Sequence, residues 1–134
     1  MATQPFGWSE FYKLAQELLA LGEESHLRTA VGRAYYFVFH LARTRLIDNQ
    51  FVIYPGQDSH KQVWEKYIGS PDPHCIKLGE MGKRLKGKRE TADYESHFVR
   101  IEKDAPELVA TAENFATLLE KLDPRLPSNG GVRR

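Results

Sequence analysis

The sequence contains only one cysteine, Cys75, in 134 residues. A single thiol excludes an internal disulfide and any zinc site built from several cysteines. Cys75 stands next to His74, but no base lies at a defined spacing that would activate it as a nucleophile. His26, His74 and His97 are not spaced from one another, or from acidic residues, in the manner of metal ligands. We therefore expect no metal ion and no other cofactor.

Long apolar runs are also missing. No stretch approaches the roughly 20 consecutive apolar residues that a membrane-spanning helix needs. The first residues, MATQP, have neither the basic flank nor the apolar run of a signal peptide. The sequence therefore predicts a cytoplasmic protein with no membrane partner.

The chain has almost no excess of charge. Its 19 Lys and Arg residues and 18 Asp and Glu residues give a net charge of +1, which neither requires nor excludes a polyanionic partner. Residues 83–89, KRLKGKR, nevertheless hold five cations in seven positions. This run is a candidate contact for an RNA backbone or for nucleotide phosphates, although such runs are commonly solvated helix faces. The candidate binding residues in it are Lys83, Arg84, Lys86, Lys88 and Arg89.

Strand patterns and internal repeats are absent from the sequence, whereas apolar residues recur at helical spacing. Helices are expected over residues 9–22, 26–47, 59–68, 74–85 and 104–123, and residues 86–103 show no clean period. The last helix is expected to start at Asp104 as its N-cap, with Pro106 in its first turn. The sequence thus predicts one all-α domain over residues 1–123, a four- to five-helix up-and-down bundle, and a disordered tail over residues 124–134.

Residues 27–45, LRTAVGRAYYFVFHLARTR, form the longest apolar stretch that is compatible with a helix. At about 100° per residue, its side chains separate onto two faces. The apolar face carries Leu27, Ala30, Val31, Ala34, Val38, Leu41 and Ala42. The opposite face carries Thr29, Arg33, Tyr36 and His40. We expect this long second helix at the centre of the bundle, with a functional site on its polar face.

Arg33 and His40 are seven residues apart, so on a helix they differ by about 20° in azimuth and about 10 Å in height. Arginine presents a planar fork of donors to a phosphate, and histidine exchanges a proton near neutral pH. Such a pair can direct a ribose 2′-hydroxyl onto the adjacent phosphorus without a metal ion. His40 would act as general base or acid, and Arg33 would stabilise the charge on phosphorus. In the alternative, Arg33 pairs with a buried carboxylate and His40 is a hydrogen-bonded core histidine.

The string LRTAVGRAYYFVFHLAR, residues 27–43, resembles the second helix of HEPN domains. These are small helical bundles of prokaryotic toxin, nucleotidyltransferase-partner and defence systems. The string is similar in particular to the subgroup with a basic residue followed by Ala-Tyr-Tyr and then Phe-His. The family motif is an arginine and a histidine separated by four to six residues, and six residues separate Arg33 from His40.

Two other segments resemble the same family. Residues 59–63, SHKQV, are similar to the start of its third helix, and residues 89–94, RETADY, are similar to an element before its last helix. The resemblance therefore covers about residues 9–122 with its elements in the right order. It implies a HEPN-like helical bundle.

The resemblance also implies a metal-independent ribonuclease centre, usually placed where two protomers meet across a twofold axis. Arg33 would be the phosphate ligand and His40 the acid or base, in a homodimer that binds RNA or a nucleotide. A toxin or defence role is implied, with an antitoxin or a nucleotidyltransferase as the protein partner. Active members often carry a polar residue directly after the arginine, and this chain has Ala34 there. The alternative is a non-catalytic module that binds a nucleotide or a protein partner, or a structural dimer.

Four further side chains are candidates for the same site. Tyr36 shares the polar face and is expected to stack on a base or bond a phosphate, or else to pack in the core or a dimer interface. His60, near a helix start, is expected to contact the substrate or to act as a capping or surface residue. Asp93 and Tyr94 are expected to orient the arginine–histidine pair, or to fix the loop before the last helix.

Overall fold

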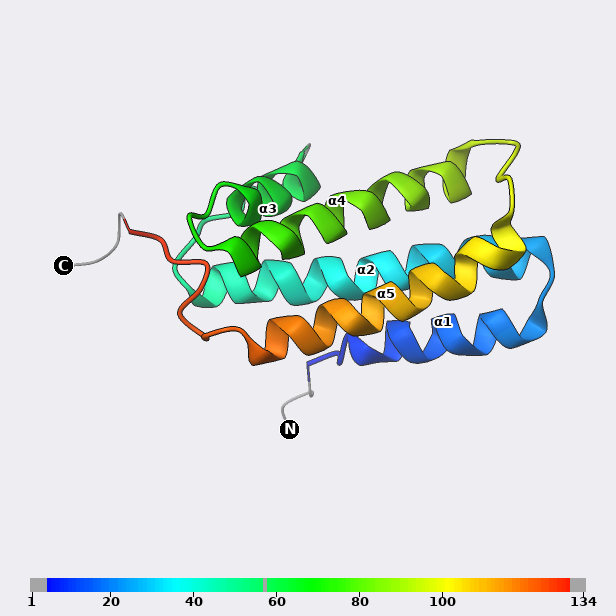
Figure 1. Ribbon diagram of the computed structural model, residues 1–134, viewed down its shortest axis with the longest axis horizontal. Helices are drawn as coiled ribbons and strands as arrows, with labels where there is room; N and C mark the ends of the chain where they lie inside the picture. The colour runs from blue at the N-terminus through cyan, green and yellow to red at the C-terminus, as the bar shows by residue number, and fades with distance from the viewer. Residues whose placement is uncertain (1–4, 57, 131–134) are drawn as a thin grey trace.

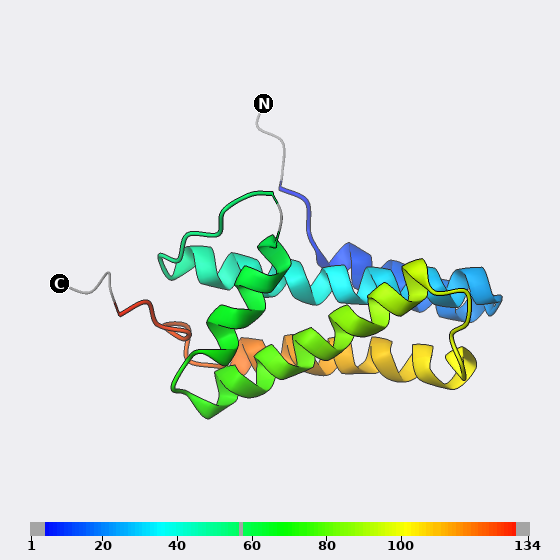
Figure 2. The same ribbon diagram turned by 90° about the horizontal axis from the view of Figure 1, so that it is seen from above.

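The computed structural model describes residues 5–56 and 58–130, and the described residues form five helices and no strand. The helices are α1 (Ser9–Leu21), α2 (Glu24–Asp48), α3 (Ser59–Ile68), α4 (Pro73–Tyr94) and α5 (Ile101–Lys121). The four long helices lie side by side and alternate in direction (Figure 1). Figure 2 shows the short α3 running steeply across the axis of α2, towards the start of α4. The predicted all-α bundle is confirmed, and no helix in the described ranges is long and apolar enough to span a membrane.

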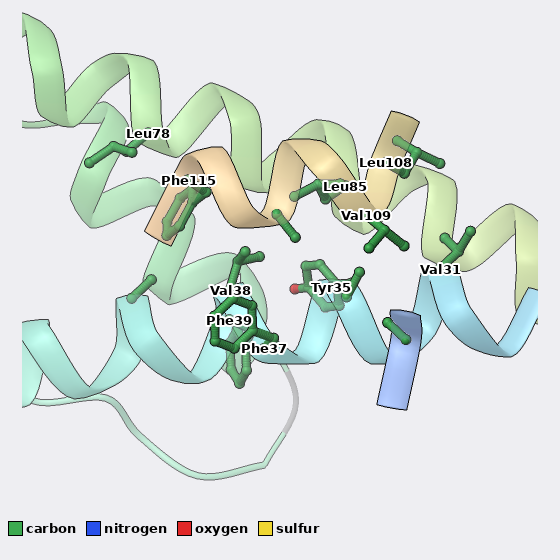
Figure 3. Packing of buried hydrophobic residues seen from close by; sticks show 14 of the residues in the cluster. Val31, Tyr35, Phe37, Val38, Phe39, Leu78, Leu85, Leu108, Val109 and Phe115 are labelled. Atoms are coloured by element: carbon green, nitrogen blue, oxygen red, sulfur yellow. The ribbon is translucent and has the colours of Figure 1, made fainter. Parts of the chain in front are cut away.

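The long α2 lies at the centre of the bundle and contacts all four other helices. Figure 3 shows Val31, Tyr35 and Val38 pointing from α2 towards α4 and α5. Most of the predicted apolar face is at most 5% exposed, namely Leu27, Ala30, Val31, Ala34, Val38 and Ala42. Phe37 and Phe39 are buried as well, because α1 and α3 cover further sides of α2. The prediction of a central second helix is therefore confirmed.

Two arginines of α2 bond the C-terminal ends of neighbouring helices. The Arg28 guanidinium donates to three carbonyl oxygens after or near the end of α4, those of Ala92, Glu95 and Ser96, at 2.9, 2.7 and 3.1 Å. The Arg45 guanidinium donates to three carbonyl oxygens near or after the end of α5, those of Leu119, Asp123 and Leu126, at 2.6, 3.2 and 2.9 Å. The last carbonyls of a helix lack partners within the helix and favour a nearby cation. These bonds fix α4 and α5 in position along α2.

The predicted fourth helix is too short, because α4 continues beyond residue 85 to residue 94. Gly79 and Gly82 disfavour a helix by their intrinsic propensity, but here they allow α4 to approach α3 closely. A Cβ atom at Gly82 would lie 2.2 Å from Cζ3 of Trp64, and one at Gly79 would lie 2.6 Å from Cγ1 of Ile68. Packing between the two helices thus outweighs the local cost of the glycines.

The predicted start of the last helix at Asp104 is wrong, because α5 begins at Ile101. Arg100 precedes it with a left-handed φ of 65°, and its carbonyl oxygen accepts from the backbone N–H groups of Lys103 and Asp104 at 3.0 and 2.9 Å. Ile101 is 1% exposed, so the additional turn buries an apolar side chain. Pro106 consequently lies inside the helix instead of in its first turn.

Residues 124–130 pack against the end of α2, whereas the sequence predicted disorder from residue 124 onwards. The Asn49 side-chain amide donates to the Pro127 carbonyl at 3.1 Å, and the Asn129 amide donates to the Gln50 carbonyl at 3.0 Å. Pro127 is buried. These contacts join residues almost 80 positions apart, so the local composition gave no indication of them. The rest of the predicted tail, residues 131–134, lies outside the described residues.

Candidate functional site

Tyr36 lies at the centre of a group of cationic and imidazole side chains. The guanidinium carbons of Arg33 and Arg89 lie 5.4 and 5.5 Å from the centre of the Tyr36 ring. The ring centres of His40 and His60 lie 6.4 and 5.8 Å from it. We call these five residues the Tyr36 cluster. Three come from α2, one from α3 and one from α4, so the packing of three helices assembles a positively charged site suited to an anion.

The Arg33 guanidinium has no ion pair and no hydrogen bond to any described residue, although its Nε atom is buried. Its carbon atom lies 4.6 Å from the centre of the Phe11 ring. Arg28 and Arg45, on the same helix, each donate to three carbonyl oxygens instead. A buried donor without a partner costs about 1–3 kcal/mol, which an anion bound to Arg33 would recover. The alternative of a pair with a buried carboxylate does not hold for the described residues.

The His40 ring is stacked on the Trp8 ring, with ring centres 3.5 Å apart and planes 5° from parallel. Phe39 meets its edge with ring centres 5.3 Å apart. Burial lowers the pKa of His40, and the Arg43 guanidinium lowers it further. The imidazole is therefore neutral at pH 7 and able to accept a proton. In the two described ranges neither of its nitrogens has a hydrogen bond, so it is not the hydrogen-bonded core histidine of the alternative prediction.

The His60 ring is joined to the core by a hydrogen bond. Its Nδ1 atom lies 2.6 Å from the Tyr35 hydroxyl, which also accepts from the Trp64 indole N–H at 3.0 Å. The ring is stacked on Phe39, with centres 3.9 Å apart. Burial lowers the pKa of His60 to about 4, with further lowering by Arg89 and smaller effects of other nearby charges. The structure thus places His60 beside the polar face of α2, as a neutral imidazole at pH 7.

The basic run of residues 83–89 lies within α4, and the helix divides its side chains between different faces. Lys83 and Arg84 are exposed, and Lys88 is partly buried. Lys86 forms an ion pair with a glutamate one turn later, at 2.9 Å. Of these five residues, Arg89 joins the Tyr36 cluster, and it is only 9% exposed. Residues that are contiguous in the sequence therefore fall into a surface group and a buried site residue.

Asp93 bonds Arg89 instead of Arg33 or His40. Its Oδ2 atom accepts from Nη1 of Arg89 at 3.1 Å, while the buried Nε atom of Arg89 has no partner among the described residues. Tyr94 is 77% exposed at the end of α4. It makes no hydrogen bond or ring contact with Arg33 or His40 in the described part of the chain. The contacts thus make Asp93 an orienting residue for Arg89, and they give Tyr94 no place beside the pair.

Four side chains at the site had no functional prediction from the sequence, namely Trp8, Phe11, Phe39 and Arg43. Trp8 immediately precedes α1 and Phe11 lies in its first turn, and both reach α2 only through tertiary packing, so no local pattern indicated them. Arg43 follows His40 by three residues, which places both on one side of a helix. That spacing was the one signal available.

Cys75 and Ala34 are both fully buried. Burial raises the pKa of the Cys75 thiol, which keeps it protonated and unreactive at neutral pH. The side chain at position 34 lies in the core, away from the polar face of α2. Residues 5–56 and 58–130 contain no group of three or more His, Cys, Asp or Glu side chains placed to hold a metal ion.

A family model described as the HEPN domain matches residues 9–122, a range that includes all five helices. No curated protein and no solved structure matches the chain.

Proposed function

The chain belongs to the HEPN domain family, and from this premise we propose that it binds RNA at the Tyr36 cluster and cleaves it without a metal ion. The observation that carries the proposal is the state of Arg33 and His40. Arg33 has a buried Nε donor and no anionic partner among the described residues, and His40 is a neutral imidazole without a hydrogen bond there. Both side chains lie beside the Phe11 and Tyr36 rings. One phosphodiester group in that space would meet a charge-stabilising group and a base.

The proposed reaction is an internal transfer within RNA. His40 removes the proton from a ribose 2′-hydroxyl, and the 2′ oxygen attacks the adjacent phosphorus. The bond from phosphorus to the 5′ oxygen breaks, and the proton returns from the imidazolium to that oxygen. Arg33 stabilises the negative charge that builds on the phosphoryl oxygens. The products are a 2′,3′-cyclic phosphate and a 5′-hydroxyl end.

The rest of the RNA would be held by side chains around this pair. A base can stack on an aromatic ring, with about 1–3 kcal/mol per stacked base, and Tyr36 is the ring between Arg33 and His40. The backbone phosphates would meet cations of α4. The proposed binding residues are Tyr36, His60, Lys83, Arg84, Lys86, Lys88 and Arg89.

The direct experiment measures cleavage of a long single-stranded RNA in EDTA by the purified protein. We expect wild type to cleave it and the His40→Ala variant to be at least about 100-fold slower, because removal of a general base has effects of that size. The matched control is His97→Ala, which changes an exposed histidine outside the Tyr36 cluster and is expected to cleave like wild type. Absence of cleavage by wild type, or equal cleavage by wild type and His40→Ala, would refute the proposed ribonuclease activity.

We also propose that the protein acts as a homodimer in a toxin or defence role, with an antitoxin or nucleotidyltransferase as its regulating partner. Phe6 and Leu14 support a dimer face, since they are 53% and 39% exposed and line one surface hollow with Phe11. That surface adjoins Arg33, so a second protomer there would border the site. Light scattering on the purified protein tests the dimer: a mass of one chain at micromolar concentration contradicts it.

A non-catalytic module that binds a nucleotide or a protein is the second candidate. It is favoured by the Trp8 ring, which covers one face of the His40 ring and leaves less room for a reacting ribose. A nucleotide or protein that co-purifies with the chain, together with equal RNA binding by wild type and His40→Ala and no cleavage by either, would support this candidate over the enzyme.

A further inference from the structure

The hydrogen bond between Tyr35 and His60 determines which imidazole nitrogen carries the proton. The indole N–H of Trp64 can only donate, so the Tyr35 oxygen accepts it at 3.0 Å. The single hydrogen of the Tyr35 hydroxyl then has one acceptor among the described residues, His60 Nδ1, 2.6 Å away. If Nδ1 donated instead, this buried hydrogen would be left without an acceptor there, which costs free energy. Nδ1 accepts that hydrogen and is unprotonated. The neutral ring therefore carries its own hydrogen on Nε2.

The surroundings hold this ring in one orientation. Tyr35 and Trp64 are 0% and 1% exposed, so the hydrogen-bonded chain that ends at Nδ1 is embedded in the core. Phe39 is stacked on one face of the imidazole, with planes 12° from parallel, and the Tyr36 ring stands at 80° to it. A donor held in this way loses little rotational freedom when it binds a ligand.

Charges around His60 favour its neutral form. Arg89 and Lys86 on α4 and His40 on α2 oppose protonation, and Glu90 on α4 favours it. Burial is the main cause, and together with the cations of Arg89 and Lys86 it keeps the imidazole uncharged at pH 7. A neutral ring with an Nε2–H group donates a hydrogen bond but does not take up a second proton.

The Nε2–H group itself has no hydrogen-bond partner in residues 5–56 and 58–130. It is also not one of the unpaired polar atoms in these ranges that are buried from solvent. It is thus a free donor that solvent reaches, on a ring whose centre lies 5.8 Å from the centre of the Tyr36 ring. The guanidinium groups of Arg33 and Arg89 also lie near the Tyr36 ring, where they supply positive charge. An anionic oxygen is the acceptor that this combination of groups would attract.

We propose that His60 is a fixed hydrogen-bond donor which binds a phosphate oxygen of RNA through Nε2, with Tyr35 as its positioning residue. This role rests on the proposed RNA function of the cluster. It differs from the role of His40, since His60 binds and His40 exchanges the proton. The substrate phosphate is then held between a guanidinium, a neutral imidazole donor and the base.

Two substitutions separate the functions of the two His60 nitrogens. In His60→Asn the side-chain oxygen replaces Nδ1 and still accepts from Tyr35, but the Nε2–H donor is lost. In His60→Gln the side-chain amide places a donor near the position of Nε2 and loses the contact with Tyr35. Binding is measured with 2′-O-methyl RNA, which keeps the phosphates and lacks the attacking hydroxyl. We expect about tenfold weaker binding by His60→Asn, as for loss of a hydrogen bond to a charged group, and near wild-type binding by His60→Gln.

Nitrogen NMR of the free protein tests the proton position without any substrate. We expect the His60 signals of an unprotonated Nδ1 and a protonated Nε2 at pH 7, and a mixture of the two tautomers in Tyr35→Phe. A proton on Nδ1 in wild type would overturn the proposal. So would equal RNA affinity of wild type and His60→Asn.

Failure of this inference is distinguishable from failure of the proposed function. If wild type binds and cleaves RNA while His60→Asn binds it equally well, only the role of His60 is wrong. If wild type neither binds 2′-O-methyl RNA nor cleaves RNA, the proposed function fails and the role of His60 fails with it.

Discussion

The rings of Trp8 and His40 lie face to face, with centres 3.5 Å apart and planes 5° from parallel. Trp8 immediately precedes α1, whereas His40 lies near the middle of α2. Stacking at this distance removes one face of the imidazole from water. A substrate would therefore meet His40 at its nitrogen edge, and the basicity of that edge depends on the cover that Trp8 provides.

Replacement of Trp8 by alanine is expected to raise the pKa of His40 towards its ordinary value. Burial is the main cause of the lowered pKa, and loss of the indole returns water to one face of the ring. An NMR titration that follows the His40 ring signals measures the change. Val99→Ala, at a side chain that is 76% exposed, is the control and should leave the titration unaltered. An unchanged His40 pKa in Trp8→Ala would show that Trp8 does not shield the ring in solution.

His60 should make the protein less stable in weak acid. Its pKa is about 4 in the folded protein and about 6.5 in an unfolded chain. Between these two values the unfolded chain binds a proton that the folded protein does not, so the free energy of unfolding falls as the pH falls from 6.5 to 4. Above pH 6.5 the imidazole of His60 is neutral in both states, so its effect on the free energy of unfolding no longer changes with pH.

The measurement is urea unfolding between pH 4 and 8 for wild type and His60→Asn. We expect wild type to lose on the order of 2 kcal/mol more than the variant across the window, after allowance for solvent screening at a half-buried group. His40 adds a loss of the same sign in both proteins, so the difference between them isolates His60. Parallel pH profiles of the two proteins would contradict the assigned environment of His60.

Gly82 and Gly87 form a matched pair on α4 with opposite expectations. A Cβ atom at Gly82 would lie 2.2 Å from the Trp64 ring, whereas nothing lies within 4 Å of a Cβ atom at Gly87. Gly82→Ala should therefore force α3 and α4 apart and lower the free energy of unfolding by about 1–3 kcal/mol. Gly87→Ala should raise it by up to about 1 kcal/mol through helix propensity. Urea unfolding measures the free energy of unfolding of both variants. A Gly82→Ala variant more stable than wild type would mean that α3 and α4 do not approach each other closely.

The predictable part of the fold followed from patterns within single helices. The apolar spacing of residues 27–45 gave α2, its buried face and its central position, because helical periodicity is a local property of the chain. The extension of α4 and the earlier start of α5 depended instead on tertiary contacts. From its propensity alone, Gly82 disfavours a helix, and only the structure shows that Trp64 occupies the space where a side chain would lie. In the same way, Ile101 could not be assigned to a helix before its burial was known.

The candidate site divides in the same way. The common face of Arg33, Tyr36 and His40 could be predicted, since all three lie on one helix at spacings of three and four residues. The hydrogen bond from Tyr35 to His60 joins residues 25 positions apart on two helices. Tyr35 is fully buried, and the contact of its hydroxyl group with His60 could not be predicted from its position on α2 alone.

Product analysis tests the central claim, that Arg33 and His40 act together on a phosphodiester, most directly. RNA is incubated in EDTA with wild type, Arg33→Gln or His40→Ala, and the new ends are identified by mass spectrometry. We predict 2′,3′-cyclic phosphate and 5′-hydroxyl ends from wild type, with at least about 100-fold less product from each variant. Ends carrying a 3′-hydroxyl and a 5′-phosphate, or equal amounts of product from wild type and either variant, would contradict the account.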